Sequence, residues 1–162
     1  MRTRQPTATL ETLRIPVQAK LAAAWTSVMF LYIYVDYLAL YKPGVVDDIL
    51  VGVVHEFETG PTFLALAITL MAIPSLMVLL STTLPARANR AVNLAVATLL
   101  IPASIYNVSG EESWDYSYFY GLSIGLEVLI LVFILRLAWT WPRRAASSAD
   151  VATRPDREVV GL

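Results

Sequence analysis

The sequence has no cysteine and only one histidine. Without a thiol, disulfides, thiolate metal ligands and cysteine nucleophiles are excluded. The single histidine, His55, has only loose carboxylates beside it and falls short of the ligand set of a zinc site. Phosphate-binding loops, nucleophile elbows and haem patterns do not appear either. The sequence therefore predicts no metal and no cofactor, and it favours a non-enzymatic role over an enzyme.

Charge is also scarce. Charged residues make up 15% of the 162 residues, against about a quarter in a soluble domain. The formal net charge is −1, so no basic surface is available to attract nucleic acid. Hydrophobic residues reach 57%, which is typical of a membrane protein. We expect a lipid bilayer as the surroundings of the chain and no nucleic-acid partner.

Four apolar runs are each about as long as a membrane-spanning helix, which needs roughly 20 residues to cross about 30 Å of hydrocarbon. The predicted fold class is all-α, a four-transmembrane-helix bundle with spans at about 17–41, 61–82, 91–108 and 118–141. These spans form one transmembrane domain, residues 17–142. We expect a polar N-terminal tail over residues 1–16 and a disordered C-terminal tail over residues 143–162.

Residues 45–58 are too short to span a membrane, but they have a helical pattern. Their apolar residues fall at 45, 46, 49, 50, 53, 54 and 57, on one face of a helix. This predicts a short amphipathic helix at the membrane interface, between the first and second spans.

Basic residues gather on one side of the predicted bundle. Ten of the twelve Lys and Arg residues lie in the two tails, at the start of the first span or in the turn after the second. The other side has Lys42 and seven carboxylates. Loops rich in Lys and Arg stay on the cytoplasmic side of a membrane. We therefore predict a multi-pass protein of the cell membrane with both termini in the cytoplasm.

Two acids lie inside predicted spans, where a charged group is costly and usually functional. Asp36 and Glu127 differ in depth by roughly 6–7 Å, both in the outer half or near the middle. One interpretation is a tyrosine belt at the headgroups with a snorkelling acid. The other is an outward-facing pocket for a small molecule, a cation or a proton. That pocket would be lined by Asp36, Glu127, Tyr32, Tyr34, Tyr37, Tyr106 and Tyr120.

Three further residues are expected to pack helices together. Asn93 is expected to hydrogen-bond between helices, and Gly121 and Gly125 form a pair of small residues four apart. Such a pair marks close packing, within the chain or against another copy. The candidate protein partners are therefore a second copy, giving a homodimer, or another membrane protein.

Three runs carry a resemblance over residues 18–142: YVDYLALYKPG, LMAIPSLMVLLSTTLPARANRAVN and EVLILVFILRLAWTWP. The chain resembles a family of small bacterial four-span membrane proteins of unknown function, which is distantly similar to DoxX-like membrane proteins. The matching residues are Asp36, Pro43, Gly44, Pro74, Arg87, Asn89, Arg90, Asn93 and Glu127. Ala72 departs from the pattern, since relatives often have an acid there. The resemblance implies the fold and topology but no activity.

Two classes of function follow from these observations. The first is a membrane protein that binds or transports a small molecule, a cation or a proton through the tyrosine- and acid-lined pocket. The alternative is an accessory subunit of a membrane complex, either structural or linked to quinone by the DoxX-like analogy.

Overall fold

The structure is a computed structural model that describes residues 14–54, 57–109 and 116–142. Most of the two predicted tails, and His55, lie outside these residues. The described residues form five helices, α1 Val17–Ala39, α2 Val45–Leu50, α3 Pro61–Thr83, α4 Ala86–Ser109 and α5 Ser117–Trp139. They also form one hairpin of two short strands, β1 Val53–Val54 and β2 Phe57–Glu58. Four of the helices are long and apolar enough to cross a membrane, which confirms the predicted all-α bundle.

Proline and glycine set the helix ends. α1 follows Pro16, and α3 begins at Pro61, where the missing proline N–H would have no partner in any case. Beyond the end of α1, Gly44 has φ +87, a left-handed conformation that favours glycine. Within the spans most backbone groups pair inside their own helix, as a lipid environment requires, but Pro74 in α3 and Pro102 in α4 have no N–H to donate.

The segment between the first two spans differs in part from its prediction. The short helix is present as α2, but it ends at Leu50, and the prediction of a helix over the rest of 45–58 is wrong. Gly52 has φ +84, which a continuing helix does not allow. After it, Val53–Val54 pairs antiparallel with Phe57–Glu58, because β-branched valines suit a strand.

The third span begins earlier than the sequence suggested. α4 starts at Ala86, directly after Pro85, whereas the prediction placed the start of the third span at about residue 91. Arg87, Asn89 and Arg90 therefore lie on the helix itself. This difference matters because it places Asn89 one turn before Asn93 on the same face.

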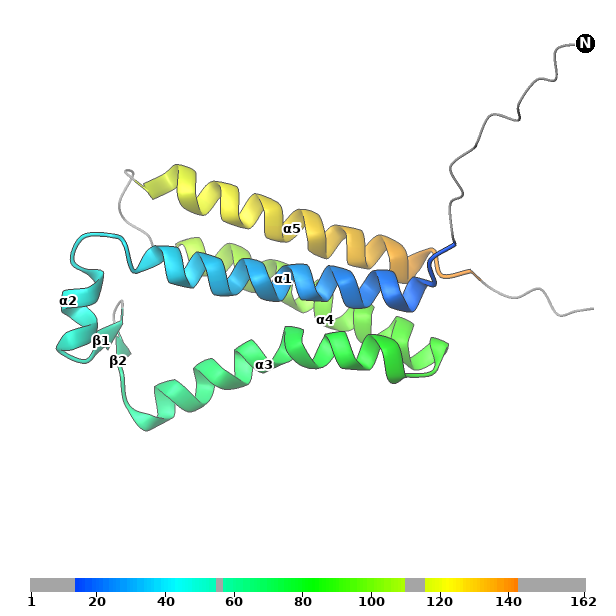
Figure 1. Cartoon of the computed structure of the whole chain (residues 1–162), viewed down its shortest axis with the longest axis horizontal. Helices are drawn as coiled ribbons and strands as arrows, with labels where there is room; N and C mark the ends of the chain where they lie inside the picture. The colour runs from blue at the N-terminus through cyan, green and yellow to red at the C-terminus, as the bar shows by residue number, and fades with distance from the viewer. Residues whose placement is uncertain (1–13, 55–56, 110–115, 143–162) are drawn as a thin grey trace, which may run out of the picture.

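The helices pack around α1, which contacts α3 on one side and α5 on the other (Figure 1). α4 packs chiefly against α5. Pro74 lies inside α3, removes one backbone hydrogen bond and accounts for the bend near the middle of that helix. The first half of α3 leads away from α1, and its side chains are exposed, among them Leu64, Leu66, Ile68 and Leu70.

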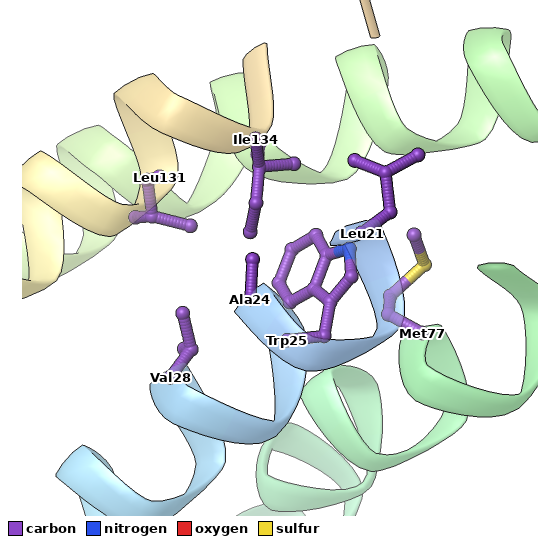
Figure 2. Packing of buried hydrophobic residues seen from close by; sticks show 8 residues of the cluster. Leu21, Ala24, Trp25, Val28, Met77, Leu131 and Ile134 are labelled. Carbon is purple, nitrogen blue, oxygen red and sulfur yellow. The ribbon is translucent and has the colours of Figure 1, made fainter. Parts of the chain in front are cut away.

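The apolar core lies where α1, α3, α4 and α5 meet. Trp25 is fully buried, and its indole ring lies among Leu21, Ile134 and Met77 (Figure 2). Most large side chains outside this core are exposed, as expected when the surroundings are lipid rather than water.

The two ends of the bundle differ in charge. We call one the basic end, where α1 and α4 begin and α3 and α5 end; its described charges are Arg14, Lys20, Arg87, Arg90 and Arg136. We call the other the acidic end; it carries α2 and the hairpin, with Asp47, Asp48 and Glu58. The predicted charge asymmetry is therefore present between the two ends of the folded chain.

Candidate functional site

Glu127 is the buried acid of the bundle. It lies on α5 with only 8% of its surface exposed. The Tyr32 hydroxyl of α1 donates a hydrogen bond of 2.6 Å to Glu127 Oε1. The Ser104 hydroxyl of α4 is hydrogen-bonded to the same oxygen. One carboxyl group thus joins three helices, α1, α4 and α5.

No cationic side chain among the described residues pairs with Glu127. Arg136 follows it by nine residues on α5, which is two and a half helical turns, so the two side chains point to opposite faces. The partners of the carboxyl group are neutral hydroxyls. A buried charge without a counter-charge is costly, and at this position only hydroxyl groups offset that cost.

The protons of the site can be counted. The Ser104 hydroxyl has one proton, but two acceptors lie within hydrogen-bond distance: Glu127 Oε1 and the Leu100 carbonyl oxygen, the latter at 2.8 Å. If Glu127 carries a proton on Oε1, it donates to Ser104 Oγ, and Ser104 donates to Leu100. Tyr32 then donates to Oε1 as before. Each proton has one acceptor in that arrangement, whereas an ionised carboxylate makes two acceptors compete for the Ser104 proton.

Asp36 lies on the acidic-end side of this site. It follows Tyr32 by four residues, about one helical turn, on α1, so the two side chains lie on the same side of the helix. Its side chain is exposed, and it has no hydrogen-bond partner among the residues that the structure describes. Tyr32 therefore stands between an exposed acid and a buried one.

The other tyrosines of the predicted pocket lie elsewhere. Tyr34 is exposed and stacks on Phe30, and the Tyr37 hydroxyl pairs with that of Tyr41 at 2.9 Å. Tyr106 is 81% exposed. Of the seven residues proposed from sequence, the structure joins Glu127 to Tyr32 and sets Asp36 beside them.

Tyr120 belongs to a separate cluster at the acidic end. Lys42 Nζ donates to the Tyr120 hydroxyl at 2.9 Å and lies 4.8 Å from the centre of its ring. It also lies 4.9 Å from the centre of the Tyr116 ring. Both rings attract the ammonium group, which links the turn after α1 to the start of α5.

A second polar network lies in the core near the basic end. Trp25 Nε1 donates to Asn93 Oδ1 at 2.7 Å, and Asn93 Nδ2 donates to Asn89 Oδ1 at 2.7 Å. Asn89 Nδ2 in turn donates to the Ser81 carbonyl oxygen at 2.6 Å. Both asparagines are fully buried. The network ties α1, α3 and α4 together, and we assign it a structural role.

Ser104 of the Glu127 site and Asn89 of the structural network were not predicted from sequence as interaction partners. Ser104 carries no local signal, because serine is common in membrane helices. Asn89 could have been found: Asn89 and Asn93 are four residues apart and share a helix face once the helix begins at Ala86.

Gly121 and Gly125 are exposed on α5. A Cβ added at either position would meet nothing within 4 Å. These glycines therefore make no close helix contact within the described part of this chain, and any packing at this face would need a second molecule.

Comparison with known proteins places the chain in a family. A family model described as "Family of unknown function (DUF6326)" matches residues 15–148, which include all four spans. The chain therefore belongs to this family of unknown function. Searches of curated proteins and of solved structures give no match.

Proposed function

We propose that this member of a family of unknown function is a small multi-pass membrane protein that binds and releases a proton at Glu127. The observation that carries the proposal is one buried carboxyl group, 8% exposed, hydrogen-bonded to the hydroxyls of Tyr32 and Ser104. Ionisable groups inside membrane spans commonly belong to proton or ion pathways. The sequence predicted a site for a small molecule, a cation or a proton, and of these three ligands we propose the proton.

The route to the carboxyl group runs from the acidic end. Asp36 is exposed and lies nearer the acidic end than Tyr32 does. Tyr32 in turn contacts Glu127 directly. A phenol can accept a proton on its oxygen while passing its own proton to the next acceptor. Tyr32 is thus the candidate relay, Asp36 the candidate entry group and Glu127 the candidate proton acceptor.

The proposal includes an orientation. With the basic end in the cytoplasm, Asp36 faces the external side of a cell membrane and both termini are inside. Reporter fusions at the C-terminus test this orientation. A reporter that is active only outside the cytoplasm would overturn it, and the proton would then be taken from the cytoplasm instead.

Infrared difference spectroscopy of the protein in lipid tests the proton site. A protonated carboxyl group gives a C=O stretching band that an ionised one lacks. Every carboxyl group contributes to this band on acidification, so the test is the difference between the natural protein and Glu127→Gln. We expect one component of the band, at the frequency of a buried carboxyl group, to be missing in Glu127→Gln. The matched control is Glu58→Gln, which removes an exposed carboxylate of β2 and leaves that component in place. Spectra of the natural protein and of Glu127→Gln without such a difference would overturn the proposal.

Asp36→Asn tests the entry route separately. If Asp36 passes protons to Tyr32, the Glu127 component of the infrared band should still form in this variant but more slowly after a rapid change of pH. An unchanged rate would remove Asp36 from the route and leave Glu127 as the site.

The alternative function, an accessory subunit with its DoxX-like analogy, stays a prediction. Quinone bound to the purified protein would be detected by its absorbance.

A further inference from the structure

A groove runs along the outside of the bundle between α1 and α5, in the half nearer the basic end. Its volume is about 370 Å³. On the α1 side its wall includes Lys20, Ala23 and Ser27, and on the α5 side Leu129, Ile130 and Phe133. The groove is separate from the Glu127 site, and none of the Glu127 partners lines it.

Small side chains on α1 produce the recess. Ala23 and Ser27 present little volume opposite the larger side chains of Leu129 and Phe133. The Ser27 hydroxyl donates to the Ala23 carbonyl oxygen at 3.1 Å, so its proton is already used. Beyond Lys20 at its basic end, the groove is therefore apolar and offers its surface to hydrocarbon.

The length of the groove suits part of an acyl chain. From Lys20 to Ser27 the helix rises about 10 Å, roughly a third of the hydrocarbon thickness of a bilayer. The groove begins near the end of the span, where lipid headgroups lie. A chain that enters from that end would run parallel to the helices.

Two cations flank the end of the groove. Lys20 lies at its rim, and Arg136 follows Phe133 by three residues, on the same face of α5 and one turn nearer the basic end. Both side chains are exposed. The five described charges of the basic end are all positive, so neither cation has a carboxylate partner there within the described ranges.

We propose that this groove binds an anionic phospholipid. One acyl chain lies between α1 and α5, and the phosphate group is held by Lys20 and Arg136. Arginine binds phosphate in a two-point geometry, and lysine reaches the interface with its long side chain. The occupant is thus recognised by negative charge at the headgroup and by hydrocarbon in the groove.

Native mass spectrometry of the detergent-solubilised protein tests the proposal. The protein is mixed with equal amounts of phosphatidylglycerol and phosphatidylcholine that have identical acyl chains. We expect several-fold more retained phosphatidylglycerol, and we expect Lys20→Gln and Arg136→Gln each to reduce that preference. Arg87→Gln removes an exposed cation of the same end on α4, away from the groove, and should leave the preference unchanged.

Ala23→Phe tests the acyl-chain part. Ala23 is exposed, so a larger side chain can fill the groove without entering the core, and an unchanged melting temperature would show that the fold is kept. We expect this variant to retain less of both lipids while both cations are present. Equal retention of the two lipids by the natural protein, an equal loss in Arg87→Gln or no effect of Ala23→Phe would each overturn the proposal.

Discussion

The Tyr32 hydroxyl and the Glu127 carboxyl group meet at 2.6 Å although the two residues are 95 positions apart in the chain. The bond joins the first membrane span to the last. It makes the buried acid part of the helix packing as well as the candidate proton site, and the two roles can be separated by substitution.

Tyr32→Phe removes the hydroxyl and keeps the ring. We expect the free energy of unfolding to fall by about 1–3 kcal/mol, because a buried carboxyl group loses a hydrogen bond. Thermal or denaturant unfolding in detergent measures the change. Tyr34→Phe is the matched control, since Tyr34 is exposed on the same helix, and it should change stability little. Equal effects of the two substitutions would contradict a stabilising role for the Tyr32–Glu127 bond.

Glu127→Gln and Glu127→Leu should differ in stability. The glutamine carbonyl oxygen can take the place of Oε1 and still accept from Tyr32 and Ser104, so we expect a loss of about 1 kcal/mol or less. Leucine leaves the Tyr32 hydroxyl without its acceptor, and we expect a loss of about 2–3 kcal/mol. Unfolding measurements on both variants test this order. If leucine proves as stable as glutamine, the hydroxyl has found another partner.

The Trp25–Asn93 bond should carry coupling energy. Trp25→Phe removes the indole N–H, and Asn93→Ala removes the oxygen that accepts from it. Asn93→Ala also removes the donor to Asn89 Oδ1. In a double-mutant cycle we expect the combined loss to be smaller than the sum of the single losses by about 0.5–3 kcal/mol. Additive losses would mean that the two residues contribute independently.

Substitution of the α5 glycines should reveal whether a second molecule packs there. In an isolated chain, Gly121→Ala and Gly125→Ala should each stabilise the helix by about 0.5–1 kcal/mol, because the added Cβ meets nothing and alanine favours helix. Light scattering of the same samples reports the oligomeric state. A drop in the fraction of dimer, with lower stability, would instead place a second copy at this face.

The positions of the spans were accessible from sequence because hydropathy accumulates along a continuous run. Residues such as those of 61–82 and 118–141 are apolar whichever way the helix turns, so length and composition suffice. The helix ends depend on Pro and Gly, and the sequence signals were sound where these residues stand, as at Pro61. The hairpin after α2 was missed because the apolar spacing of residues 45–58 also fits a helix. In the structure Gly52 ends the helical conformation, and the valines after it form a strand.

The partner of each polar residue was not accessible in the same way. The spans α1, α3 and α5 are apolar on all faces, so no stripe tells which face turns inward. Sequence reasoning set Asp36 and Glu127 together as a pair with five tyrosines. The helix rotation brings only Tyr32 to Glu127, adds Ser104 from α4, and turns Tyr34 and Tyr106 outward.

The amino-acid sequence alone specified a membrane protein of four helices. It also specified an unequal division of charge between the two ends and one acidic residue in each of two spans. These properties are local or additive along the chain. Which hydroxyls bind Glu127, and the burial of Asn89 and Asn93, depend on how three helices rotate against one another. That rotation is set by the packing of side chains from distant segments, such as Trp25 against Ile134 and Met77, and no single stretch of sequence contains it.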